Sequence, residues 1–178
     1  MINNQANDQR HLAKGELMTT HHDTPYCPIK NPEHYVRGRD YQPIDVIEAF
    51  GLCHHLACAV KYIARAGHKD NYLGDLKKAH WYIGRELERH QRGLKPCNEA
   101  LVSNPPGKMY NIPKDWNLSP GLGKALIAIL EFSCEKRFFD WFIGHYTHTD
   151  IGAITELQNS ILRAHNFLHE EIEAFQCD

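Results

Sequence analysis

The stretch NPEHYVRGRDYQPIDVIEAFGLCHHLACAVKYIARAGHKDNYLGDLKKAHWYIGRELERH, residues 31–90, decides the fold of this chain. Apolar residues recur in it at helical spacing, and Gly51 and Gly67 divide it into three segments. Such spacing gives a helix one apolar face, and glycine just after the last helical residue is a common helix end. The stretch therefore predicts three consecutive amphipathic helices.

Capping residues indicate where these helices begin and end. We expect helices over residues 44–50, 53–66 and 71–93. Pro43 suits the first position of the first helix, because proline lacks the amide N–H that would have no helical partner there. Asp70 or Asn71 can cap the third helix, since a short polar side chain can accept from the free amides of the first turn.

The third helix carries a core seam with a histidine at its centre. The seam residues alternate at spacings of three and four: Leu73, Leu76, His80, Ile83 and Leu87. Such spacing places them on one helix face. Because burial disfavours a charged imidazole, we expect His80 to be a neutral, hydrogen-bonded core residue rather than a ligand contact. The charged residues 85–90 are expected to form a solvated helix end.

The second half of the chain indicates a connection followed by further helices. Pro105 and Pro113 exclude a continuous helix from the proline-rich connection, residues 96–118, which is either a functional loop or a linker. Ser119 and Pro120 then suit a helix start. We expect a buried apolar segment over residues 122–132, a second apolar cluster over 138–143 and a last helix over 149–175.

No segment alternates between apolar and polar residues with period two. The chain is therefore predicted to be all-α, a compact helical domain of about five to six helices, several of them short. Residues 1–30 are expected to form a disordered arm, 31–95 a helical core, and 119–178 a C-terminal helical extension. The apolar stripes offer more surface than a few short helices can bury, so a homo-oligomer is expected.

Composition excludes several classes of protein. The formal net charge of −2 over 178 residues gives no basis for general nucleic-acid binding. No apolar run is long enough to span a membrane, and the polar N-terminus does not resemble a secretory signal. Six scattered cysteines lack the spacing of a zinc or redox site, so free thiols in a reducing cytoplasm are expected.

Two further motifs are better explained as ordinary helix residues. The sequence Gly121–Ala125 resembles the end of a phosphate loop, but the first glycine and the final hydroxyl of that motif are missing. His165 and His169 are four residues apart, which would let two imidazoles share a metal ion. The glycine motif lacks residues that a phosphate loop requires, and the histidine pair lacks further ligands for a metal ion. We therefore predict no metal site.

Cations and tyrosines repeat at helical spacing in the central stretch. Lys61 and Arg65 are four residues apart and flank an apolar stripe beside Tyr62. Lys69 follows in a loop, and Lys78 lies in the next helix, whose own N-terminus can bind an anion. This arrangement is consistent with a phosphate site and also with a solvated basic helix face, and the residues alone leave both interpretations open.

The same residues carry a resemblance to a known family. The segments NPEHY, IDVIEAFGL, AVKYIARAGHKD and DLKKAHWYI follow a pattern whose members here are Pro32, His34, Tyr35, Lys61, Tyr62, Arg65, Lys69, Asp75, Leu76, Lys78, Ala79 and Tyr82. The pattern resembles the SaV-like phage domain of unknown function, and also the C-terminal part of the nucleotide kinase of podophages. The resemblance covers about a third of the chain, and the half after Glu99 lies outside it.

The resemblance implies a phage-type nucleotide-binding protein in the cytoplasm of an infected or lysogenic bacterial host. It would transfer a phosphoryl group from an ATP-like or dNTP-like nucleotide to a (deoxy)nucleoside monophosphate, and a role for Mg²⁺ stays open. The implied catalytic residues are His34, Lys61 and Asp75; the implied nucleotide-binding residues are Tyr35, Lys61, Tyr62, Arg65, Lys69, Lys78 and Tyr82. Two alternatives are a protein that sequesters a nucleotide or nucleotide signal without turnover, and a structural or adaptor oligomer.

Overall fold

The computed structural model describes residue 35 and residues 38–68, 71–92, 109–145 and 151–177, with side chains described outside 135–158. The elements in these residues are α2 (Pro43–Ala49), α3 (His54–Arg65), α4 (Tyr72–Gln91), the 3₁₀ turn η1 (Met109–Asn111), α5 (Ile112–Asp115), α6 (Pro120–His145) and α7 (Ile151–Cys177). These residues contain no strand, which confirms the predicted all-α class. None of the described helices is long and apolar enough to span a membrane.

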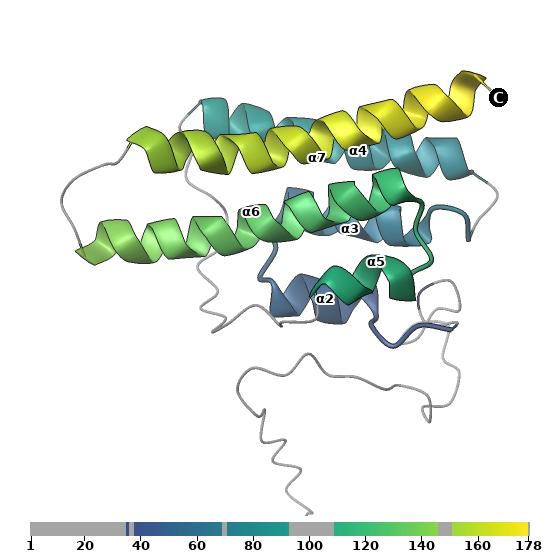
Figure 1. Cartoon of the computed structure of the whole chain (residues 1–178), viewed down its shortest axis with the longest axis horizontal. Coiled ribbons are helices and arrows are strands. Elements are labelled where there is room, and N and C mark those ends of the chain that lie inside the picture. The colour runs from purple at the N-terminus through teal and green to yellow at the C-terminus, as the bar shows by residue number, and fades with distance from the viewer. Residues whose placement is uncertain (1–34, 36–37, 69–70, 93–108, 146–150, 178) are drawn as a thin grey trace, which may run out of the picture.

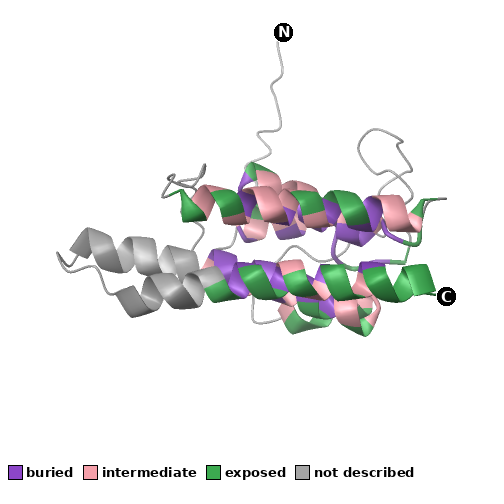
Figure 2. Cartoon of the chain, turned by 90° about the horizontal axis from the view of Figure 1, so that it is seen from above, coloured by how far each residue is buried: buried purple, intermediate pink, exposed green. Residues whose placement is uncertain are grey.

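Two helical hairpins form the two layers of the structure (Figures 1 and 2). Helices α3 and α4 form one hairpin and α6 and α7 the other, and the layers meet where α4 packs on α7 and α3 on α6. Short α2 adds to the first layer against α3, and short α5 adds to the second against α6. Buried residues lie mainly where the layers face each other (Figure 2).

The predicted caps are present at the first three helices. Pro43 is the first residue of α2, and Gly51 follows that helix with φ +51°. Gly67 follows α3 with φ +82°, a left-handed conformation that glycine adopts without steric cost. At the start of α4, Asn71 Oδ1 accepts from the backbone N–H of Gly74 at 2.8 Å, so the cap is Asn71 rather than Asp70.

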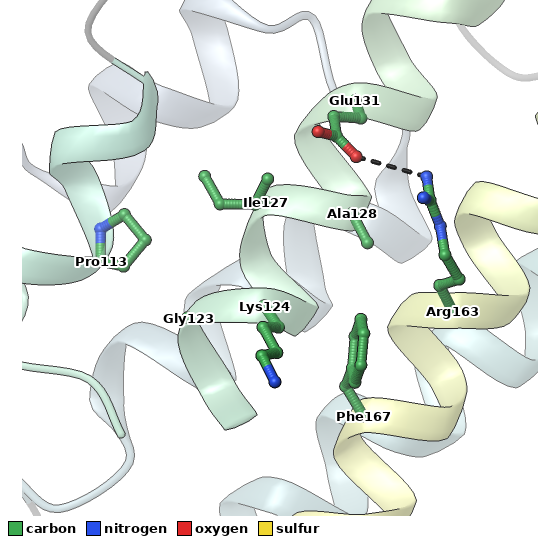
Figure 3. Close-up of a pocket in the computed structure, with 8 residues that line it drawn as sticks. All are labelled: Pro113, Gly123, Lys124, Ile127, Ala128, Glu131, Arg163 and Phe167. Atoms are coloured by element: carbon green, nitrogen blue, oxygen red, sulfur yellow. Dashed lines mark hydrogen bonds and ion pairs between the residues drawn. The ribbon is translucent and has the colours of Figure 1, made fainter. Parts of the chain in front are cut away.

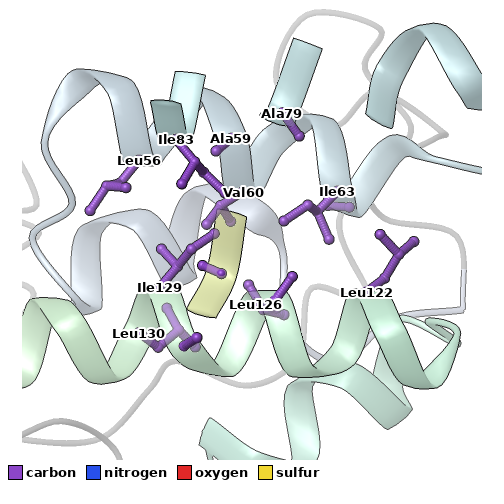
Figure 4. Packing of buried hydrophobic residues seen from close by; sticks show 14 of the residues in the cluster. Leu56, Ala59, Val60, Ile63, Ala79, Ile83, Leu122, Leu126, Ile129 and Leu130 are labelled. Carbon is purple, nitrogen blue, oxygen red and sulfur yellow. The ribbon is translucent and has the colours of Figure 1, made fainter. Parts of the chain in front are cut away.

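The core is a single cluster to which both hairpins contribute. Its centre comprises Leu56, Ala59, Val60 and Ile63 of α3, Ala79 and Ile83 of α4, and Leu122, Leu126, Ile129 and Leu130 of α6 (Figure 4). All ten are almost inaccessible to solvent. Burying such surface contributes about 25 cal/mol per Å². The apolar segment 122–132 is thus buried as predicted, but its partners lie within the same chain.

The second half of the chain differs from the expectation in two places. The apolar segments 122–132 and 138–143 belong to one helix, α6, which continues from Pro120 to His145 without a break. The proline-rich connection contains a short helix that was not predicted, because Pro113 lies in the first turn of α5, where its missing N–H has no helical acceptor. Directly after α5, Trp116 is buried and its Nε1–H donates to the Tyr41 carbonyl at 2.7 Å.

His80 lies on the core seam of α4, as predicted. The predicted hydrogen bonding of its ring is not found in the described part of the chain. Its ring centroid is 3.9 Å from that of His165 and 5.9 Å from that of His169, both on α7. Its Nε2 is buried and has no hydrogen-bond partner among the described residues. Burial, with lesser contributions from the two neighbouring imidazoles, lowers the pKa of His80 from 6.5 to about 4. At this α4–α7 contact, burial thus favours the neutral form of His80 and of His165.

This low pKa predicts a pH-dependent stability. Between pH 6.5 and about 4, His80 takes up a proton in the unfolded chain but not in the folded one, so stability falls as the pH falls through that window. His80→Leu should remove part of this loss, on the order of 1 kcal/mol after allowing for solvent around the half-buried ring. Urea unfolding at several pH values measures it.

The matched control is His54→Gln, which changes an exposed histidine at the start of α3. It should leave the pH profile as in the wild type. An unchanged profile in His80→Leu would contradict the assignment of the low pKa to this contact.

Candidate functional site

A stacked pair of tyrosines joins the two helices of the first hairpin. Tyr62 of α3 and Tyr82 of α4 have ring centroids 5.9 Å apart and ring planes 18° apart. The Arg65 guanidinium carbon lies 4.9 Å from the Tyr62 centroid, and Lys78 Nζ lies 5.4 Å from it. Each such cation–π contact stabilises by about 0.5–1 kcal/mol at an exposed position. Four of the predicted nucleotide-binding residues are thus brought together.

Arg65 is held in place by Asp75 across the turn that joins the two helices. Its Nε donates to Asp75 Oδ2 at 2.9 Å, and its Nη2 donates to Asp75 Oδ1. The hydrogen bond to Asp75 is the main reason that the pKa of Arg65 is raised. Asp75 is only 2% exposed and lies in the first turn of α4, where the helix dipole favours a carboxylate. Asp75 therefore orients Arg65; its predicted catalytic role stays a prediction.

Tyr35 lies beside this ion pair. Burial raises the pKa of Tyr35, and the charge of Arg65 opposes that rise. Asp75, Tyr62 and Arg39 also contribute to its electrostatic surroundings. The Tyr35 hydroxyl is therefore close to the groups that α3 and α4 provide, although it precedes them by a long stretch of chain.

Arg39 belongs to the same region and was not predicted. Its side chain is 6% exposed, its Nη2 donates to the Ala64 carbonyl at 2.5 Å, and its guanidinium carbon is 5.4 Å from the Trp116 ring centroid. Arg39 lies outside any periodic segment, so helix patterns could not reveal it. The only signal in the sequence is its place four residues after Tyr35.

The remaining predicted residues are exposed or outside the described part. Lys61 is exposed on α3, one turn before Arg65, and Lys78 is exposed on α4. His34 and Lys69 lie outside the described residues. Within the described side chains, no group of three or more His, Cys, Asp or Glu residues is placed to hold a metal ion.

A buried glutamate at the other end of the hairpin was expected to be solvated. Glu86 is 1% exposed; its Oε2 lies 2.9 Å from His55 Nδ1 and its Oε1 lies 3.3 Å from His90 Nε2. Burial raises the pKa of Glu86, but its interactions with His90 and His55 outweigh that effect and bring it to about 2. Residues 85–90 are therefore not simply a solvated end, because Glu86 joins α3 to α4 there.

A separate pocket of about 310 Å³ lies in the second layer (Figure 3). Its wall includes Pro113, Gly123, Lys124, Ile127, Ala128, Glu131, Arg163 and Phe167. Lys124 Nζ lies 5.6 Å from the Phe167 ring centroid. A Cβ at Gly123 would come within 3.2 Å of the Pro113 ring, so this glycine allows α5 to approach α6. The glycines that resemble a phosphate loop thus have a packing reason.

A comparison with known protein families finds a match that covers the part of the chain that contains the candidate site. A family described as a protein of unknown function, DUF3310, matches residues 29–84. This span contains every predicted site residue, from His34 to Tyr82, and ends within α4. No curated protein and no solved structure matches the chain.

The ion pair between α3 and α4 predicts a stability effect. Arg65→Ala would leave the buried Asp75 carboxylate without its partner and should destabilise the protein by about 3 kcal/mol. Arg65→Lys keeps the charge but loses the two-pronged geometry, so a smaller loss of about 1–2 kcal/mol is expected. Urea unfolding with circular dichroism measures both.

Lys61→Ala is the matched control, because Lys61 lies on the same helix and is exposed. It should change stability by less than about 0.5 kcal/mol. If Arg65→Ala unfolded at the same urea concentration as the wild type, the Arg65–Asp75 ion pair would not contribute to stability. The same reasoning makes Arg65 variants unsuitable as a clean probe of ligand binding.

Proposed function

We propose that the exposed side of the α3–α4 hairpin binds a nucleotide. The observation that carries the proposal is the Tyr62–Tyr82 stack with Arg65 and Lys78 against it. A base can stack on an aromatic ring with a gain of about 1–3 kcal/mol, and the neighbouring cations are then within reach of its phosphates. Exposed Lys61 adds a further positive charge on the same helix.

The activity that we propose first is phosphoryl transfer to a (deoxy)nucleoside monophosphate from an ATP-like or dNTP-like donor. The resemblance to the C-terminal part of the podophage nucleotide kinase supports this proposal. Such transfer depends mainly on positioning the substrates and neutralising phosphate charge, which Arg65, Lys61 and Lys78 can provide. His34 would orient the acceptor, and Lys69 would contribute to phosphate binding.

One observation favours the alternative, in which the nucleotide is sequestered without turnover. Both carboxylate oxygens of Asp75 accept hydrogen bonds from Arg65. A carboxylate held in this way is a poor general base, because accepting a proton would break a charge-assisted pair. Incubation with labelled nucleotides separates the two activities: turnover supports the transferase, and stoichiometric retention supports sequestration.

Binding can be tested by calorimetry with a panel of nucleotides. Lys78→Ala and Lys61→Ala should each weaken binding by about 1–3 kcal/mol, the range of a charge-assisted hydrogen bond, and both should keep the wild-type helicity. Tyr82→Leu should weaken it by a similar amount through lost stacking.

The control for these variants is Lys124→Ala, which removes a lysine of the separate pocket in the second layer. Its affinity for nucleotides should equal that of the wild type. Unchanged affinity in Lys61→Ala and Lys78→Ala, or a selective loss in Lys124→Ala, would place the ligand elsewhere.

We also propose a homo-oligomer in the cytoplasm of the bacterial host. The support is a set of large apolar side chains that are 41–63% exposed: Ile44, Trp81, Tyr110, Leu162 and Phe175.

Trp81 precedes Tyr82, so a second copy packed there would border the site. Light scattering at micromolar concentration should give more than the monomer mass, and Trp81→Glu should return the protein to a monomer. A monomeric wild type would contradict this proposal.

A further inference from the structure

The Arg39 guanidinium is buried but only partly bonded. Its Nη2 donates to the Ala64 carbonyl, while its Nη1 is buried without a hydrogen-bond partner among the described residues. Burial is the main cause that lowers the pKa of Arg39. A buried N–H group of a cation is costly to leave unbonded, because it has lost water and gained nothing in exchange.

The carboxylate of Asp115 acts on Arg39 but forms no hydrogen bond with its Nη1. Asp115 Oδ1 accepts from the backbone N–H of Asp40 at 2.9 Å, and its Oδ2 accepts from that of Tyr41 at 3.0 Å. Asp115 acts on Arg39 through its charge, not through a hydrogen bond to Nη1. The Trp116 ring offers its face to the guanidinium but no acceptor atom. One donor of Arg39 is therefore left without an acceptor among the described residues.

The groups around Arg39 connect it with the nucleotide site. Tyr35 interacts electrostatically with Arg39 and with Arg65, so its hydroxyl lies near both. His68, which is exposed just after α3, is close enough for Arg39 to lower its pKa. Arg65 is paired with Asp75, whereas Arg39 forms no ion pair and keeps one nitrogen unbonded among the described residues.

We propose that Arg39 Nη1 binds a phosphate group of the ligand, with His68 and Tyr35 as the neighbouring groups that feel the charge of Arg39. The ligand class is a nucleoside monophosphate whose base lies on Tyr62 and Tyr82. Arginine suits this task because it can keep its bond to Ala64 with one nitrogen while the other donates to a phosphate oxygen. This inference rests on the proposed function and names the group that anchors the phosphate.

The first test uses the wild-type protein and His68. Burial and then the charge of Arg39 lower the pKa of His68. A phosphate at Arg39 neutralises that charge, so the pKa of His68, followed by NMR, should rise with inorganic phosphate and with nucleoside monophosphates. Adenosine has no phosphate and should leave the titration unchanged. A His68 titration that no phosphate compound moves would overturn the proposal.

The second test uses Arg39→Lys, in which one ammonium group cannot serve both Ala64 and a ligand. Its affinity for the four nucleoside monophosphates should fall by about tenfold or more, while its affinity for nucleosides stays unchanged. Lys124→Ala is the matched control and should bind as the wild type does. A thermal melt establishes that Arg39→Lys is folded; if it is not, the His68 titration of the wild type decides.

The outcomes separate this inference from the proposed function. If the wild type bound nucleoside monophosphates, and Arg39→Lys bound them equally well without any change at His68, the phosphate anchor would be wrong and the nucleotide site would stand. If inorganic phosphate moved the His68 titration but no nucleotide bound more tightly than phosphate alone, the anion site would stand and the nucleotide function would be wrong.

Discussion

Helix α6 has a broad apolar face that must be covered, and this requirement shapes the rest of the structure. Leu122, Leu126, Ile129 and Leu130 lie on one face of the helix and are all inaccessible to solvent, whereas Lys124, outside this face, is exposed. Helix α3 covers one side, α7 another and α5 a third. Because α3 is already paired with α4, covering α6 forces the two hairpins together face to face (Figure 4).

This packing decides which residues of the first hairpin remain available. Val60 and Ile63 point into the core, and the residues between them, Lys61 and Tyr62, face outward or lie at the edge. The polar groups of the central stretch are thereby concentrated on one side of the hairpin. The Arg65–Asp75 pair then fixes the turn between α3 and α4, and with it the distance between the two stacked tyrosines.

Two buried charged groups and one half-buried histidine differ in how the surrounding residues compensate them. Glu86 is surrounded by His55 and His90 and keeps its carboxylate charged. His80 has rings rather than acceptors beside it, so it stays neutral. Arg39 cannot lose its charge in the accessible pH range and has an unbonded donor. Glu86 is thus paired within the chain, whereas one nitrogen of His80 and one of Arg39 have no hydrogen-bond partner among the described residues.

The sequence by itself determined the helices of the first hairpin and much of the candidate site. Glycine and proline at helix ends act through the backbone of neighbouring residues, so Pro43, Gly67 and Asn71 could be assigned without knowing the fold. Helical spacing is also local, which is why Tyr62 and Arg65 could be placed on one side of α3. The sequence did not predict that α6 is one continuous helix, because two apolar segments in a row have the same pattern in one long helix as in two shorter ones.

Only the tertiary structure decided which polar groups are buried and what they contact. Arg39 lies 25 residues from Ala64, and Asp115 lies 75 residues from Asp40. Contacts between such distant residues produce no periodic pattern in the sequence. His80 was placed correctly on the seam, but its neighbours are on α7, so its loss of hydrogen bonding could not be foreseen. Burial and charge pairing depend on segments distant in sequence, whereas helix ends and faces depend on neighbours.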